Sequence, residues 1–417
     1  MQHGTRARDR HLTGARVRKA VIGVVAFAAA GVMLAACSSG SDNANGRSSG
    51  GSGSQSAPTT TSPPVNIAIT PASTPAMNPG TPVVVKATNG TLKTVAVTNA
   101  KTGATVTGDF SSDKTSWTSN EPLAFGASYS VDVTGANPQG SSSEQKSTLT
   151  TINPTKTSNT NMFPAPASVS SVGIGVGMPI VFQFTNAVKN KSDVEKAITI
   201  TTSPSQPVGF HWLSSTELDA RPQAYWKAGT SIHVVTKLYG VDLGGGNYDK
   251  DDRDVTYKVH DSWVAQANGA TEQMNILHNG SVVKTMNISM GKDSTPTSTG
   301  PHVIFDRKQQ VQMDSCTYGV CPPDPRAYNE TEYYAERITN GGEFVHENPD
   351  TVGAQGHSNV SHGCINLSPS DAQWFFNNLG IGDVVEVTNA NGAPLATTGF
   401  MGDWLIPWSQ WTPVATA

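Results

Sequence analysis

The sequence predicts a mainly β protein, built from two tandem β-sandwich domains and a third β-rich domain that contains one short helix. Three observations favour this fold class. The chain has 417 residues, a length that suits two or three domains. It contains 40 glycines and 26 prolines, and long runs with helical periodicity are nearly absent. Short alternating segments separated by turn residues occupy most of the chain instead.

The charge pattern excludes one class of partner. Charged residues make up only 14% of the chain, and the formal net charge is −4. The sequence has neither a basic stripe nor a block of like charge, so it predicts no nucleic-acid partner.

The first 64 residues predict an exported protein that is tethered to a membrane. A positively charged stretch precedes an apolar run at residues 20–36, which is typical of a secretory signal peptide spanning residues 1–36. The run ends in Leu34-Ala35-Ala36-Cys37, which resembles the bacterial lipobox, so Cys37 is the predicted lipidation site. An uncleaved membrane anchor is the alternative, because the run approaches spanning length. Residues 37–64 are rich in Gly, Ser, Thr and Pro, and we expect a flexible linker there.

Two Ig-like β-sandwich domains are predicted at residues 65–153 and 154–258. In the first, the strand-like segments 83–86 and 92–97 flank the hairpin signal Asn89-Gly90. Residues 126–133 alternate as a strand does when one face is packed, and residues 229–234 repeat their spacing one domain later. We expect three tryptophans to lie in the two cores: Trp117, Trp212 and Trp226.

A third domain is predicted at residues 259–390. Two strand-like segments, 274–277 and 282–286, flank a hairpin turn. Further on, Ser368 is a good helix N-cap, Pro369 suits the first helical position and Gly380 can end the helix. A strand is predicted at residues 384–388. The tail, residues 391–417, is rich in tryptophan, and we expect it to pack on this third domain.

An unpaired thiol, Cys364, is the clearest candidate for chemistry. The chain has four cysteines. Cys37 is assigned to the lipid, and Cys316 and Cys321 lie close together, which leaves Cys364 over. A thiol becomes a strong nucleophile when a nearby imidazole accepts its proton. Three histidines are candidate bases for it: His346, His357 and His362.

The residues around Cys364 suit a reactive loop. Gly363 allows a tight turn that lets backbone N–H groups face an oxyanion, and Asn366 can hydrogen-bond to the loop and fix its shape. Two other interpretations stay open at this point. Cys364 could be a buried core thiol. Alternatively, Cys364 could ligate zinc together with His346, His357 and His362, although the spacing matches no compact zinc pattern.

The segment Ser361-His362-Gly363-Cys364-Ile365-Asn366, with His346 upstream, resembles the signature of L,D-transpeptidases of the YkuD-type fold. The resemblance extends to Met290-Gly291-Lys292, to residues 313–319 and to residues 402–408. Together with the lipoprotein signal and the two sandwiches, the whole architecture resembles the mycobacterial members of that family.

The resemblance implies a mechanism. Cys364 would attack the carbonyl of the diaminopimelate residue in a tetrapeptide stem of peptidoglycan and release D-Ala. An amine of a second stem would then resolve the thioester, which gives a 3→3 cross-link. His346 would act as the base, and His362, Gly363 and Asn366 would shape the oxyanion loop. The resemblance also implies substrate contacts from four residues: Tyr318 on a flap over the substrate, Met313, Thr317 and Ser361.

The same resemblance implies the partners and the location. Peptidoglycan stem peptides would be the substrates, carbapenems would acylate Cys364, and neither a cofactor nor a metal is expected. The protein would be anchored to the cell membrane by lipid and face the periplasm or cell wall. Two alternatives are an enzyme that attaches a protein to diaminopimelate and a wall-binding lipoprotein without turnover.

Two positions depart from the family pattern. Glu347 follows His346 where the family often has a small residue, and its acidic side chain could raise the basicity of His346. Cys316 and Cys321 flank the presumed flap, and we predict a disulfide between them because the compartment is oxidising. The disulfide would stiffen the flap. The alternative is a redox trap, in which one flap thiol pairs with Cys364.

Overall fold

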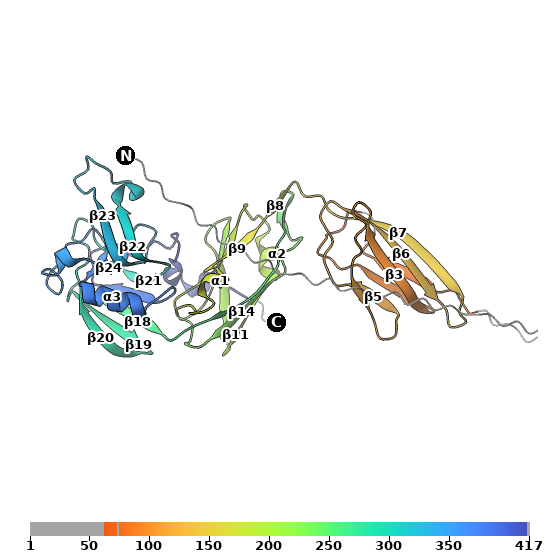
Figure 1. Cartoon of the computed structure of the whole chain (residues 1–417), viewed down its shortest axis with the longest axis horizontal. Helices are drawn as coiled ribbons and strands as arrows, with labels where there is room; N and C mark the ends of the chain where they lie inside the picture. Colours follow the sequence, from red (N-terminus) through yellow and green to blue (C-terminus); the bar gives the residue numbers. More distant parts are fainter. Residues whose placement is uncertain (1–61, 73–74, 415–417) are drawn as a thin grey trace, which may run out of the picture. The chain divides into compact units, whose positions relative to one another are not determined.

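The computed structural model describes residues 62–72 and 75–414, and Figure 1 shows the course of the chain. The predicted signal peptide (residues 1–36), the lipidation site Cys37 and nearly all of the predicted linker lie outside the described residues. Within the described part, strands dominate and the three α-helices are short, so the predicted mainly β fold class is confirmed. No helix in that part is long and apolar enough to cross a membrane.

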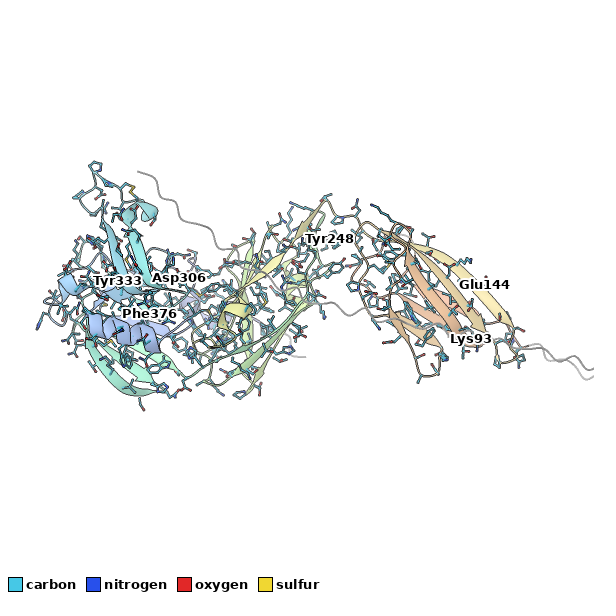
Figure 2. All side chains as sticks on the ribbon, in the orientation of Figure 1. Lys93, Glu144, Tyr248, Asp306, Tyr333 and Phe376 are labelled. Atoms are coloured by element: carbon cyan, nitrogen blue, oxygen red, sulfur yellow. A yellow bond between two sulfur atoms is a disulfide. The ribbon has the colours of Figure 1, made fainter. Side chains whose placement is uncertain are left out.

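The first sandwich consists of two antiparallel sheets. One sheet has the strand order β1-β2-β5-β4 and the other β3-β6-β7. Their bounds are β1 Asn66–Thr70, β2 Val84–Thr88, β3 Thr91–Asn99, β4 Gly108–Phe110, β5 Ser116–Ser119, β6 Ser128–Ala136 and β7 Ser142–Thr150. Strand β6 alternates between buried and partly exposed residues, as its sequence predicts, while Lys93 and Glu144 remain exposed on β3 and β7 (Figure 2). Trp117 is buried in this core, as expected.

The second sandwich has a sheet ordered β27-β12-β13-β10-β9, a sheet β11-β14-β17 and a small sheet β15-β16-β8. The bounds are β8 Lys156–Ser158, β9 Thr160–Phe163, α1 Pro166–Val169, β10 Ile180–Phe184, α2 Lys191–Lys196, β11 Ile198–Ser203, β12 Val208–Trp212, β13 Glu217–Pro222, β14 Ser231–Thr236, β15 Asp242–Gly244, β16 Asn247–Asp249, β17 Arg253–Lys258 and β27 Thr412–Pro413. Trp226 is buried in the core, whereas Trp212 is only half-buried and stacks on Phe184.

The third domain contains a five-stranded sheet, β20-β19-β18-β26-β21, and a four-stranded sheet, β22-β23-β24-β25. The bounds are β18 Trp263–Asn268, β19 Gln273–His278, β20 Ser281–Asn287, β21 Gly300–Val303, β22 Asp306–Asp314, η1 Ser315–Tyr318, β23 Asn329–Arg337, β24 Phe344–Glu347, η2 Pro349–Thr351, β25 Ile365–Leu367, α3 Pro369–Asn378, β26 Val384–Thr388, η3 Asp403–Leu405 and η4 Trp408–Gln410.

The predicted helix is α3, and its N-terminus forms as its sequence dictates. The Ser368 hydroxyl accepts a hydrogen bond from the Asp371 backbone N–H at 3.2 Å, and a proline occupies the first turn. Ala372 and Phe375, one helical turn apart, are buried against the core between the two sheets. The helix therefore supports the strands that carry the candidate site (Figure 1).

The Trp-rich tail packs on the third domain, as predicted, and also on the second sandwich. The Leu395 N–H donates to the Thr299 carbonyl of the third domain at 2.9 Å, whereas β27 pairs with the edge strand β12 of the second sandwich. The Trp404 indole N–H also donates to the Gly177 carbonyl of that sandwich at 2.7 Å. Strand β12 would otherwise leave unpaired N–H and C=O groups at the sheet edge, and the tail satisfies them. Apolar residues of the third domain, such as Val303, join the same core as the sandwich.

Candidate active site

The strand register places His346 beside the motif that contains Cys364. Strands β24 and β25 run parallel, and His346 lies opposite Asn366, two residues after Cys364. Both strands sit in the four-stranded sheet, so a separation of 18 positions in sequence becomes a neighbouring position in space. The site is therefore held by regular backbone pairing.

The loop before β25 is tightly tied. The Ser361 hydroxyl donates to the Cys364 carbonyl at 2.6 Å and accepts from the Gly363 N–H at 3.0 Å. The Thr297 hydroxyl donates to the Gly363 carbonyl at 2.8 Å. Gly363 has a φ of 126°, which a side chain would strain, so glycine is required here. Asn366 donates from its amide to the Thr351 hydroxyl at 3.2 Å.

Cys364 is a free, nearly buried thiol, 7% exposed. Its Sγ lies 3.7 Å from the Gly342 carbonyl, which accepts the thiol hydrogen. A cavity of about 240 Å³ opens at the thiol, and its lining includes the predicted residues Met313, Ser361 and Asn366. A small substrate group can therefore reach Cys364 from one side.

His346 is buried, with two acceptors at its Nδ1. The Glu347 backbone carbonyl lies 2.7 Å from Nδ1, and the Glu332 Oε2 lies 3.2 Å from it. Nε2 is therefore the nitrogen left to face Cys364. Burial alone lowers the pKa of His346, but the hydrogen bonds and charges of Cys364 and Glu332 outweigh burial and raise that pKa to about 10. We expected the side chain of Glu347 to be the acidic neighbour of His346. In the structure the acidic neighbour is Glu332, whereas Glu347 contacts the imidazole through its backbone carbonyl.

The other two histidines have different surroundings. His362 lies 5.3 Å from Tyr328 between ring centroids, and its Nε2 is 3.3 Å from the Lys292 Nζ. Burial and the Lys292 charge lower the pKa of His362, so the ring is neutral near pH 7. His357 is exposed, and its backbone N–H donates to Ala354. It lines neither cavity at the site, so the structure does not bring His357 to Cys364.

A second cavity, of about 420 Å³, lies on the other side of His362. His362 and Tyr328 line both cavities, so this ring pair separates them. Glu343 lines the larger cavity and lies beneath Gly363. Among the described residues, no group of three or more His, Cys, Asp or Glu side chains is placed to hold a metal ion.

The predicted flap residues are only partly at the site. Thr317 is exposed, and its hydroxyl donates to the Asp314 carbonyl at 2.7 Å, away from both cavities. The side chain of Tyr318 lies outside what the structure describes. Among the described side chains, Tyr328 lines both cavities together with His362.

Comparisons with known proteins point to one family. Residues 262–387 match the family model of the L,D-transpeptidase catalytic domain, and residues 74–242 match the bacterial Ig domain. L,D-transpeptidase 2 of Mycobacterium tuberculosis (strain CDC 1551 / Oshkosh) is 38% identical over 330 residues, which cover 79% of each chain. The chain belongs to the L,D-transpeptidase family.

One further relative agrees with this membership. L,D-transpeptidase 5 of Mycobacterium tuberculosis (strain ATCC 25618 / H37Rv) is 30% identical over 345 residues, which cover 81% of this chain and 74% of that protein. A solved structure of the L,D-transpeptidase LdtMt1 in complex with imipenem is 33% identical, covers 55% of this chain and 97% of that one, and superposes with a TM-score of 0.48. The resemblance inferred from the Ser361–Asn366 motif is confirmed, and this L,D-transpeptidase is an enzyme.

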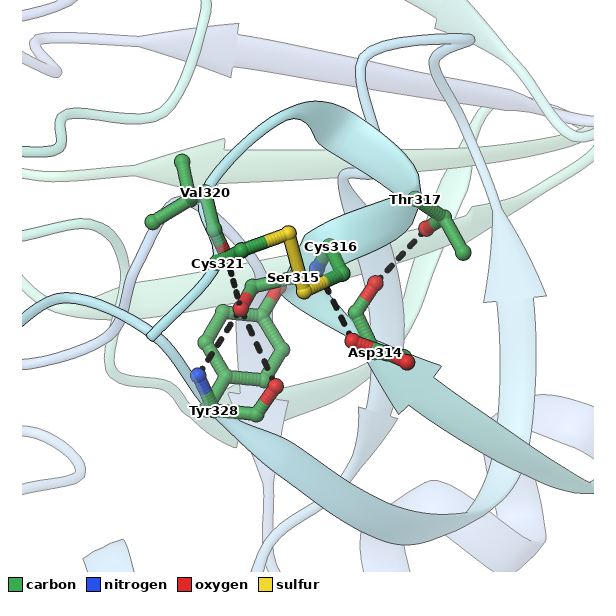
Figure 3. The surroundings of a disulfide bond; sticks show 7 residues. All are labelled: Asp314, Ser315, Cys316, Thr317, Val320, Cys321 and Tyr328. Atoms are coloured by element: carbon green, nitrogen blue, oxygen red, sulfur yellow. Dashed lines mark hydrogen bonds between the residues drawn. A yellow bond between two sulfur atoms is a disulfide. The ribbon is translucent and has the colours of Figure 1, made fainter. Parts of the chain in front are cut away.

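The L,D-transpeptidase carries a disulfide between Cys316 and Cys321, as predicted for this loop, with a Cα–Cα distance of 4.5 Å. Figure 3 shows it beside Ser315 and Tyr328. The Ser315 hydroxyl lies 2.6 Å from the Val320 carbonyl and accepts from the Tyr328 N–H at 2.8 Å. The disulfide therefore closes the turn that holds the backbone of Tyr328.

Replacing both flap cysteines, Cys316→Ser with Cys321→Ser, is expected to leave the L,D-transpeptidase folded but to slow acylation of Cys364 by less than about tenfold. The loop is short, so little stability is lost, but Tyr328 is less well positioned. Stopped-flow acylation by a carbapenem, with Thr317→Ala as the control, measures the effect. Faster acylation of the double variant would instead favour the redox trap.

Proposed function

We propose that this L,D-transpeptidase forms 3→3 cross-links between diaminopimelate residues of peptidoglycan through a thioester on Cys364. The observation that carries the proposal is the buried Cys364 beside His346, whose Nδ1 is occupied by two acceptors and whose Nε2 is free to serve the thiol. A thiolate held by an imidazolium is a nucleophile at neutral pH.

In the first half-reaction, the Cys364 thiolate attacks the carbonyl carbon between diaminopimelate and D-Ala. The tetrahedral oxyanion collapses, the C–N bond breaks, and the His346 imidazolium gives its proton to the leaving amine of D-Ala. A thioester remains on Cys364.

In the second half-reaction, His346 accepts a proton from the side-chain amine of an acceptor diaminopimelate. The amine attacks the thioester carbonyl, and the Cys364 thiolate leaves. Cavities on both sides of the His362 and Tyr328 pair offer separate approaches to this region for two stems. The strained carbonyl of a carbapenem would be attacked by the same thiolate.

We also propose a location outside the described residues. The lipobox-like segment that ends at Cys37 supports cleavage after residue 36, lipidation of Cys37 and anchoring at the outer face of the cell membrane. Intact mass of the protein isolated from membranes tests this location. A mature chain that starts at an acylated Cys37 would support it, and a chain that retains residues 1–36 would overturn it.

Intact mass spectrometry of a soluble form lacking residues 1–37 tests the reaction. A carbapenem should add one adduct per chain, and Cys364→Ala should add none. With a disaccharide tetrapeptide, loss of D-Ala followed by a 3→3 dimer is expected. Release of the donor acid without a dimer would indicate a hydrolase, and a folded chain without any adduct would indicate a wall-binding role.

A further inference from the structure

A buried carboxylate, Glu332, faces the proposed base from a neighbouring strand. Glu332 lies on β23, its side chain is 11% exposed, and its Oε2 lies 3.2 Å from the His346 Nδ1. The Glu347 carbonyl lies 2.7 Å from the same nitrogen. A neutral imidazole with its proton on Nδ1 needs only one acceptor, so the backbone carbonyl alone would fix the tautomer. The second acceptor adds a full negative charge.

We propose that Glu332 is a positioning residue for thioester formation: it holds His346 in its protonated form with Nε2 toward Cys364. This inference rests on the proposed cysteine chemistry. Without Glu332, the buried imidazolium that forms when Cys364 is deprotonated would have the thiolate as its one charged partner and a neutral carbonyl at Nδ1, which leaves its burial only partly compensated. With it, the imidazolium lies between two negative groups, the thiolate and the carboxylate.

The charges around the cavity support this assignment. Besides Glu332 and His346, the titratable side chains that line it are Tyr328, Glu330, Asp350, His362 and Cys364. Among the residues that the structure describes, the lining contains no Lys or Arg, and the Lys292 Nζ lies 3.3 Å from the His362 Nε2. Of the residues that line this cavity, His346 is therefore the one that can neutralise the buried Glu332 carboxylate. This ion pair forms only when the His346 imidazole is protonated.

Glu332→Gln keeps the size of the side chain and removes its charge. We expect acylation of Cys364 by a carbapenem at pH 7.5 to slow roughly 10- to 100-fold, the value of a charge-assisted hydrogen bond. The pH profile of the rate is the decisive readout. The pKa of His346 is raised, so the imidazolium survives to high pH in the native enzyme. Removing Glu332 should move the alkaline limb down by about one to two pH units.

The experiment uses the soluble form that lacks residues 1–37 and two matched variants. Glu330→Gln removes a charge from the same cavity and the same strand, but Glu330 is exposed, so the alkaline limb should stay in place. Glu332→Asp keeps the charge and should recover part of the rate. Thiolate absorbance near neutral pH should fall in Glu332→Gln and stay unchanged in Glu330→Gln.

The outcomes separate this inference from the proposed function. Failure of the native enzyme to form an adduct at Cys364 would overturn the cysteine chemistry itself. A native enzyme that acylates, with Glu332→Gln showing unchanged limbs and unchanged thiolate absorbance, would overturn the role of Glu332 alone. A slower rate with unmoved limbs, and no recovery in Glu332→Asp, would also overturn it, because a structural defect lowers the rate without shifting the profile.

Discussion

His346→Gln is expected to lower the rate of Cys364 acylation by roughly 10²- to 10⁴-fold, the usual contribution of a general acid or base. The glutamine can still donate to the Glu347 carbonyl, so the strand pairing of β24 with β25 should survive. What disappears is the group that takes the thiol proton. The thiol of the variant would keep its hydrogen bond to the Gly342 carbonyl and would have no imidazole at residue 346 to accept its proton.

Time-resolved intact mass with a carbapenem measures this rate in folded protein. His357→Gln is the matched control, since His357 is exposed and lines neither cavity at Cys364. The control also decides between the bases that the sequence left open. An unchanged rate in His346→Gln together with a slow rate in His357→Gln would contradict the assignment of His346.

The sequence could predict the residues that lie in one contiguous motif. Ser361, Gly363, Cys364 and Asn366 meet because they are neighbours along the chain. The family resemblance selects His346 from the three candidate histidines. Glu332 belongs to no motif, and its place depends on how β23 pairs with β24, a register that the local sequence does not encode. The position of Tyr328 at the site could not be predicted for the same reason, since Tyr328 reaches the site through the turn closed by the disulfide. The substrate contact implied for Tyr318 stays a prediction.

The tail illustrates a second limit. Its tryptophans predict that the tail is buried against another part of the protein, but the sequence does not indicate which surface buries them. The tail packs around Arg221, a buried residue on strand β13 of the second sandwich. Its guanidinium lies 4.5 Å from the Trp404 ring centroid and 4.3 Å from that of Trp411, and it donates to the Ile406 carbonyl at 2.9 Å. No pattern along residues 217–222 signals this role.

Arg221 also lies beside two buried acids, Asp219 on β13 and Asp403 in η3. Burial raises the pKa of Asp219 well above its usual value, and the charge of Asp403 adds to this; burial likewise raises the pKa of Asp403. Burial lowers the pKa of Arg221 to about 10, so the guanidinium stays charged at neutral pH. The Arg221 guanidinium therefore offsets, together with His211, the negative charge of Asp403.

Arg221→Met is expected to lower the free energy of unfolding by roughly 3–5 kcal/mol, the cost of leaving buried charge without its partner. The loss should grow with pH. A carboxyl group whose pKa is raised in the folded state stabilises the fold fully at pH values below 3.8, its pKa in the unfolded chain. This stabilisation is lost as the pH rises through the pKa of the folded state. Above that range the pair ionises, and the missing guanidinium matters most.

Urea unfolding at pH 5 and pH 8 measures both effects. Arg253→Met is the matched control, because Arg253 is partly exposed with its ion pair to Asp251 near solvent, and its loss should cost about 0–1 kcal/mol. Adding Asp403→Asn to Arg221→Met should recover part of the stability at pH 8 by removing the uncompensated charge. Equal losses in the Arg221 and Arg253 variants, or no recovery in the double variant, would mean that the tail is held by aromatic packing and the β12–β27 pairing alone.

The acylation rate of Cys364 in the folded Arg221→Met protein should stay near that of the native enzyme, since neither cavity at Cys364 is lined by Arg221 or by the tryptophans of the tail.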